Sequence, residues 1–169
     1  MDRDSFDRLL LDHLAAAQRF AVRLSGDAQS AEDLLHDAIV RAVKNFSSFR
    51  GQSKFTTWLF KIIINCFRQR LRRKPMSLMG EGQVDARTMD PTSASDAEEL
   101  SRIVAQRISS LPPRQREVLV LIVYERMSIT ETSQVLGIAN QTVRTSLSLA
   151  RKRLKQELAI YLNAGIRGK

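Results

Sequence analysis

A group of closely spaced carboxylates near residue 35 is a candidate for acid–base or metal chemistry. Glu32, Asp33 and Asp37 lie within a short segment that also contains His36. Two carboxylates can share general acid and base work, but a metal centre needs further ligands at suitable spacing, and only His36 is near. The other histidine and the one cysteine lie elsewhere in the chain. The pattern therefore predicts no catalytic residue, no metal site and no cofactor, and it favours a protein-contact surface or a plainly solvated helix face.

A run of basic residues offers a different chemistry, the binding of phosphate. Residues 54–74 include seven lysines and arginines and no acid. In a helix, polar and basic side chains of this segment would lie opposite Trp58 and Ile62. These side chains are Thr57, Lys61, Asn65, Arg68 and Arg72. Cations beside aromatic side chains suit a nucleic-acid single strand. A solvated helix face is the alternative; we expect Phe55 and Trp58 in the core, whereas Phe49, in the preceding loop, is more open.

Residues 128–155 have the spacing of a helix-turn-helix. Ser128 and Glu131 match a capping box, and Gly137 suits the left-handed end of a short helix. A second helix is predicted from Gln141 to about Leu158. Its inward residues are Val143, Leu147, Ala150 and Leu154. Its outward residues are Gln141, Arg144, Thr145, Ser148 and Lys152. Such a face can read base edges in a major groove, or it can be the solvated side of an ordinary helical hairpin.

Three helices would position the first basic surface. Apolar residues at three- and four-residue spacing predict helices over residues 4–24 and 55–73, with another between them. For this middle helix, Ser30 is the expected cap and Asp33 the residue that reaches back to it. Pro75 stops the third helix because it cannot continue the backbone hydrogen bonds. These three helices form the first block.

Residues 75–96 separate this block from a second one. The segment contains two glycines and two prolines and has neither a helical nor a strand period, so it is predicted to be a linker. The second block starts near Asp96, and Pro113 suits the first turn of one of its helices. The sequence thus predicts an all-α fold of two small helical domains, residues 1–74 and 97–169, joined by a flexible linker over 75–96.

Composition narrows the partners and the compartment. The chain has 169 residues, 27 lysines and arginines against 18 acids, and a net charge of +9. This balance suits a nucleic acid or an acidic surface, although a soluble protein can simply be basic. One cysteine permits no internal disulfide and favours a reducing cytoplasm. The first residues are rich in acids and are followed by no apolar stretch, so we do not expect a secretory signal there. No apolar segment is long enough for membrane insertion.

Taken together, the two blocks resemble the extracytoplasmic-function (ECF) sigma factors of bacterial RNA polymerase. In the first block, AEDLLHDAIVRAVKNF (31–46) resembles the helix that binds the polymerase clamp, and FRGQSKFTTWLFKIIIN (49–65) resembles the promoter-melting segment of region two. In the second, LPPRQREVLVL (111–121) and residues 127–158 resemble region four. The resemblance covers nearly the whole chain except the linker and the termini.

The resemblance implies a sigma factor that binds core RNA polymerase and promoter DNA, has no catalysis of its own, and in most relatives is held by an anti-sigma factor. The implied polymerase contacts are Asp33, Leu34, Asp37 and Arg41. The implied minus-ten contacts are Phe49, Arg50, Gln52, Ser53, Lys54, Lys61, Asn65, Arg68 and Arg72. The implied minus-thirty-five contacts are Gln141, Thr142, Arg144, Thr145, Ser148 and Lys152. The rival interpretations are a stand-alone helix-turn-helix regulator and, more remotely, a nucleic-acid enzyme.

The second block departs from the family pattern at four positions. The family often has an arginine where Ser146 stands and a basic residue where Leu149 stands, so this recognition helix is less basic than usual. Thr132 and Ser133 replace a more apolar pair of the preceding helix. Ser146 is expected at the boundary between the inward and outward faces, from which an arginine could reach phosphate.

Overall fold

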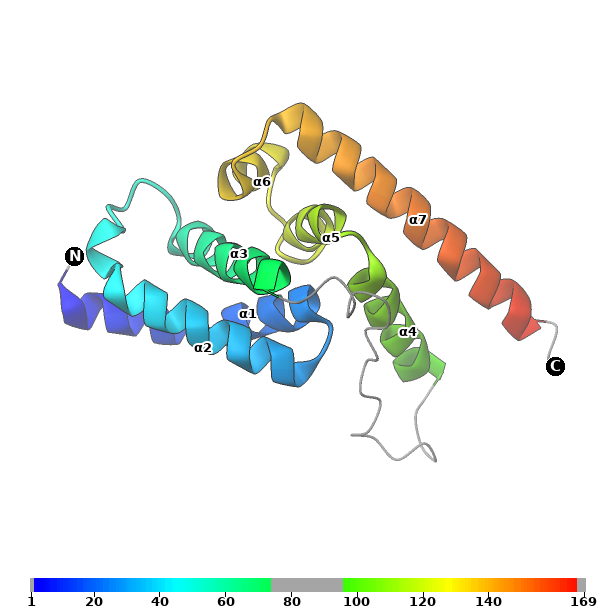
Figure 1. Ribbon diagram of the computed structural model, residues 1–169, viewed down its shortest axis with the longest axis horizontal. Coiled ribbons are helices and arrows are strands. Elements are labelled where there is room, and N and C mark those ends of the chain that lie inside the picture. Colours follow the sequence, from blue (N-terminus) through cyan, green and yellow to red (C-terminus); the bar gives the residue numbers. More distant parts are fainter. Residues whose placement is uncertain (1, 74–95, 167–169) are drawn as a thin grey trace.

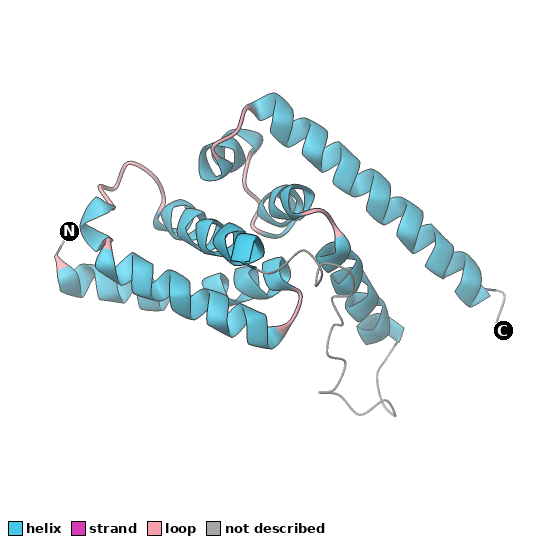
Figure 2. Ribbon diagram, viewed as in Figure 1, coloured by secondary structure: helices cyan, strands magenta, loops and turns pink. Residues whose placement is uncertain are grey.

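The computed structural model describes residues 2–73 and 96–166, and all the regular elements within these ranges are helical (Figures 1 and 2). The expected all-α fold class is therefore confirmed. We refer to the two described ranges as the N-terminal half and the C-terminal half.

The N-terminal half begins with two antiparallel helices, α1 (Arg3–Ser25) and α2 (Ala28–Lys44). Gly26 ends α1 in the left-handed conformation, with φ of 89°. The cap of α2 differs from the sequence prediction: the Asp27 carboxylate accepts a hydrogen bond from the Ser30 amide at 2.7 Å, so the helix starts before Ser30. An aspartate two residues after the end of α1 caps the next helix without a longer loop, and the predicted Ser30 cap is wrong.

Helix α3 (Phe55–Arg73) packs on α1 and α2 with the bounds that its sequence pattern predicts. Its buried face is rotated relative to the expected stripe: Thr57 is buried, whereas Trp58 and Ile62 are half-buried. Phe60, Ile64 and Phe67, which were not part of the expected stripe, are buried as well. Because these large apolar side chains also face the core, the buried face turns toward them and away from Trp58 and Ile62. Thr57 therefore does not belong to the exposed polar face.

Aromatic side chains fill the core between these helices. The Phe20 and Phe60 rings stack with centroids 4.3 Å apart, and Phe6 meets Phe55 edge-on at 5.8 Å. Phe6 and Phe20 are fully buried. These contacts fix α3 against α1, and the polar face of α3 consequently points away from the core.

The C-terminal half contains α4 (Asp96–Ser110), α5 (Pro113–Leu119), one turn of π-helix, η3 (Val120–Tyr124), α6 (Ile129–Leu136) and the long α7 (Asn140–Ile166). Pro113 occupies the first turn of α5, as predicted. Ser128 and Glu131 form the predicted capping box, and Gly137 ends α6 with φ of 65°. Helices α5 and α6 lie between α3 and α7 (Figure 1).

The two halves contact each other through α1 and α3 on one side and α4, α5 and α6 on the other. Arg116 of α5 donates a hydrogen bond to the Leu24 carbonyl at 2.6 Å, and its guanidinium lies over the Phe67 ring. Burial lowers the pKa of Arg116 from its ordinary value. At the same contact, Gly26 lies directly against Ser109 of α4.

Candidate polymerase and nucleic-acid interfaces

The loop before α3 presents mostly exposed polar side chains. The exposed members of the predicted set are Arg50, Gln52, Ser53 and Lys54. Phe49 is half-buried, with its ring 5.3 Å from that of Phe55 and 5.6 Å from that of Trp58. Its aromatic contacts hold the start of the loop against the core, and its side chain remains partly exposed.

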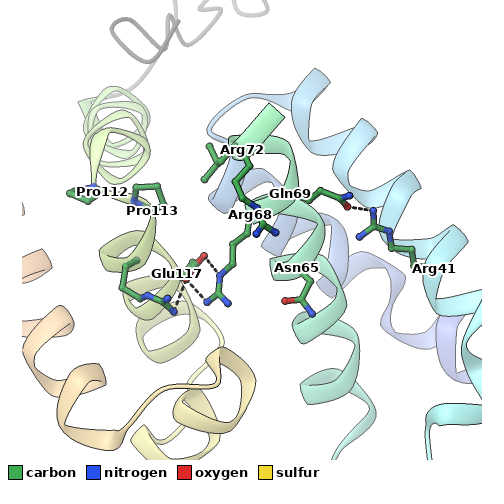
Figure 3. A pocket seen from close by; sticks show the side chains of 10 residues that line it. Arg41, Asn65, Arg68, Gln69, Arg72, Pro112, Pro113 and Glu117 are labelled. Carbon is green, nitrogen blue, oxygen red and sulfur yellow. Dashed lines mark hydrogen bonds and ion pairs between the residues drawn. The ribbon is translucent and has the colours of Figure 1, made fainter. Parts of the chain in front are cut away.

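On the polar face of α3, three of the predicted residues have exposed side chains, and a fourth forms an ion pair with the C-terminal half. Lys61, Asn65 and Arg72 are exposed. Arg68 instead reaches across to α5, where its two guanidinium nitrogens donate to the two carboxylate oxygens of Glu117 at 2.8 Å each (Figure 3). Beside this pair lies a cavity of about 850 Å³, lined by Asn65 and Arg72 among others. Because its surroundings are rich in arginine, this face suits phosphate.

The carboxylates of α2 are held by a cation of α3. Arg70 donates two hydrogen bonds to Asp37, at 2.7 and 2.9 Å, and lies 3.6 Å from Asp33. Arg41 donates to the side-chain carbonyl of Gln69. Together these side chains form a charged, partly exposed surface along α2 and α3.

Leu34 was expected to contact the polymerase, but the structure does not present it on the surface. Its side chain is fully buried, because it projects from α2 into the core with Ala31 and Ala38. Leu34 therefore stabilises the helix that carries this surface and does not itself offer a contact.

The first turns of α7 present a polar face. All the predicted reading residues are exposed: Gln141, Thr142, Arg144, Thr145, Ser148 and Lys152. The inward residues also lie as predicted, with Val143, Leu147 and Ala150 buried and Leu154 half-buried. Ser146 is buried, with only 8% of its surface exposed, whereas Leu149 is 47% exposed. The expected boundary position for Ser146 is therefore wrong, and Leu149 is the residue that borders the polar face.

Sequence reasoning missed the carboxylates that join the halves. Glu117 is 1% exposed, and Arg114 approaches its carboxylate at 3.5 Å in addition to Arg68. Glu131 caps α6, and its Oε1 also accepts a hydrogen bond from Nζ of Lys54, in the N-terminal half, at 3.3 Å. The hydrogen bonds from Ser128 and Lys54 lower the pKa of Glu131 to about 2. The capping box was visible in the sequence, but the partners from the other half were not.

Similarity to known proteins decides the family. The Sigma-70 region 2 family matches residues 9–75, and the Sigma-70 region 4 family matches residues 101–154. The chain is 32% identical to the ECF RNA polymerase sigma factor SigM of Mycobacterium tuberculosis over 166 residues, covering 98% of this chain and 82% of SigM. It is 30% identical to SigW of Bacillus subtilis, covering 93% and 90% of the two chains. The chain belongs to the ECF sigma factors.

A solved structure of a relative has the same fold. The sigma factor RpoE from Bartonella quintana, in complex with the anti-sigma factor NepR, superposes with a TM-score of 0.74 at 28% identity, over 92% of this chain and 98% of RpoE. This ECF sigma factor is thus a promoter-recognising initiation factor for RNA polymerase, and the stand-alone regulator is not favoured. Among the described residues, no helix is long and apolar enough to cross a membrane.

Proposed function

We propose that residues 1–74 and 97–169 act as two separate contact modules, joined by residues 75–96, and that the first binds core RNA polymerase through α2. The surface of Asp33, Asp37 and Arg41 is suited to a charged helical partner. It combines both signs of charge, is partly exposed, and is held in one geometry by Arg70 and Gln69. Such complementary charge steers association and fixes the orientation of the partner.

The proposed minus-ten contact consists of the loop before α3 and the polar face of α3. The loop contributes Phe49, Arg50, Gln52, Ser53 and Lys54, and the helix contributes Lys61, Asn65, Arg68 and Arg72. Cations along one face can follow the phosphates of a melted strand. Asn65 is suited to reading a base, because its amide can donate and accept.

The proposed minus-thirty-five contact is the exposed face at the start of α7. A helix of this kind enters the major groove with its N-terminal residues toward the base edges. Arg144 can donate two hydrogen bonds to a guanine, and Gln141 can do the same to an adenine. Lys152, two turns further along, is positioned for phosphate.

Core polymerase and promoter DNA are found in the bacterial cytoplasm, so the proposed site of action is the cytoplasm. In this proposal the factor catalyses no reaction itself. An anti-sigma factor is a further proposed partner, since RpoE of Bartonella quintana was solved in complex with the anti-sigma factor NepR.

The observation that carries the proposal is the combination of an exposed basic and amide-bearing face on α3 with an exposed recognition face on α7, in a chain of this family. The test is to add the purified chain to sigma-free core polymerase and to measure transcription from a library of promoter fragments. Promoter-dependent transcripts are expected. DNA binding by the chain with no gain from core would indicate a stand-alone regulator instead.

A further inference from the structure

The cavity between α3 and α5 is lined by more cations than its own acid can balance. Its volume is about 850 Å³, and in Figure 3 the prolines at the start of α5 lie on one side of it and α3 on the other. The charged residues in its wall are Arg41, Arg68, Arg72, Arg114 and Glu117. Four positive charges and one negative charge leave the wall with a net charge of +3. Because cations around one space repel each other, this cavity favours an anion.

The arginines differ in what already holds them. Arg68 donates to both oxygens of Glu117, at 2.8 Å each, and to the Leu136 carbonyl, so this pair neutralises the one acid of the wall. Arg114 approaches the same carboxylate only at 3.5 Å, and 43% of its side chain is exposed. Within the part of the chain that the structure describes, the Arg72 side chain forms no ion pair and no hydrogen bond. One cation from each half, Arg72 and Arg114, therefore remains for a ligand.

Two side-chain amides and two prolines complete the wall. The carbonyl of Gln69 accepts a hydrogen bond from Arg41, which leaves its NH2 group to donate elsewhere. Asn65, exposed one turn earlier on α3, offers both a donor and an acceptor. Pro112 and Pro113 add apolar surface from α5. Small-molecule sites combine apolar walls with a few placed polar groups and measure about 300–1,000 Å³, so this cavity has the size and composition of such a site.

We propose that this cavity binds a nucleotide with a chain of two or more phosphates, such as a nucleoside triphosphate. Arg72 and Arg114 hold the phosphates, because a guanidinium can donate two parallel hydrogen bonds to phosphate oxygens. The amides of Asn65 and Gln69 hydrogen-bond the base, and the prolines contact its apolar face. Arg114 belongs to neither the proposed polymerase contact nor the proposed minus-ten contact, so the site is distinct from both.

The nucleotide would contact both halves of the chain at once. It binds only where α3 and α5 are adjacent, and it stabilises that arrangement more as its concentration exceeds the dissociation constant. It also uses Asn65 and Arg72 of the proposed minus-ten contact, so a DNA strand and the nucleotide exclude each other there. The nucleotide concentration then sets the share of the free factor that carries the ligand.

Isothermal titration calorimetry on the full chain tests the site with three probes: ATP, GTP and inorganic tripolyphosphate. A salt concentration of about 0.15 M screens the attraction of distant surface charges. Arg114→Gln removes the cation on the α5 side, and Arg72→Gln removes the one on α3. The matched control is Arg8→Gln, which removes the same charge from an exposed position of α1 outside the cavity.

We expect ATP or GTP to bind the wild type at one site per chain, and tripolyphosphate to bind several-fold more weakly because it has no base. Arg114→Gln and Arg72→Gln are each expected to weaken nucleotide binding about tenfold or more, the effect of losing a hydrogen-bonding charge. Arg8→Gln is expected to bind like the wild type. Absence of saturable nucleotide binding, or equal weakening by Arg114→Gln and Arg8→Gln, would overturn the inference. Tripolyphosphate bound as tightly as ATP and GTP would also overturn it, because the amides and prolines would then contribute nothing.

Open-complex formation by the holoenzyme without nucleotides keeps the proposed function separate from this inference. Permanganate footprinting is expected to show the same melting for Arg114→Gln as for the wild type, since Arg114 is outside the proposed promoter contacts. A melting defect of Arg114→Gln would place this arginine in promoter binding and overturn its assignment to a nucleotide site. If the wild type itself melts no promoter, the proposed function is overturned, whatever the titrations show.

Discussion

Asp33 and Asp37 stand one turn apart on α2, and both face Arg70 of α3. Replacing both by Ala is expected to weaken binding to core polymerase by about 2 kcal/mol, because truncating a charge pair that a partner desolvates leaves the opposing charge unsatisfied. Competition binding to core against the wild-type protein measures the loss. Asp12→Ala on the exposed side of α1 is the control. Undiminished binding of the double variant would remove this surface from the proposed interface.

Asn65 lies exposed on α3, one turn before Arg68. Asn65→Ala is expected to slow open-complex formation several-fold while binding to core stays at the wild-type level, because the amide is placed to hydrogen-bond a flipped base and supports no packing. Permanganate footprinting of the melted region on a time course measures the rate. The control is Gln18→Ala on α1, also exposed. A melting rate equal to that of the wild type would exclude Asn65 as a reader.

The helices that carry these residues were predictable to different degrees. The bounds of α3 and the capping box of α6 follow from local pattern and agree with the structure, because both depend on residues within a few positions of each other. The cap at Asp27 was missed, since the loop between α1 and α2 is shorter than the pattern suggested. The pairing of Arg68 with Glu117 was not predictable, because nothing local brings α3 and α5 together.

Helix α7 has one exposed apolar residue beside its reading face, Leu149. Leu149→Arg is expected to steepen the salt dependence of holoenzyme binding to promoter DNA by about 0.9 in the log–log slope, one phosphate contact on duplex DNA. Leu149→Gln, which adds polarity without charge, is expected to leave the slope unchanged. Ser146→Arg, in contrast, would bury a cation and lower the stability of the C-terminal half. Equal slopes for Leu149→Arg and Leu149→Gln would show that this side of α7 does not face DNA.

The capping box of α6 makes the protein sensitive to acid. The pKa of Glu131 falls from its ordinary 4.5 to about 2, chiefly through the hydrogen bonds from Ser128. A carboxylate with a lowered pKa in the folded state stabilises the protein above its ordinary pKa, and this contribution is lost as the pH falls toward the lowered value. The free energy of unfolding of the wild type relative to Glu131→Gln should therefore shrink between pH 4.5 and about 2. Urea denaturation across that range measures it, and a constant difference would contradict the assignment.

At the scale of the whole molecule, the close approach of the halves depends on a residue without a side chain. Gly26 ends α1 with φ of 89°, and a Cβ placed there would lie 2.6 Å from the Cβ of Ser109 in α4. Such a distance requires the backbone of one half to move relative to the other. Gly137, which ends α6 with φ of 65°, has the same conformational role, but nothing lies within 4 Å of its missing Cβ.

This pair of glycines allows the contact between the halves to be measured as a stability difference. Gly137→Ala is expected to cost about 1–2 kcal/mol, the strain of a left-handed residue with a Cβ. Gly26→Ala is expected to cost about 1–3 kcal/mol more, because the added methyl group overpacks the contact with Ser109. Urea denaturation of the full chain measures both values. Equal losses would mean that α1 and α4 are apart in solution. The two glycines differ only in that Ser109 of α4 lies against Gly26, whereas nothing lies against Gly137.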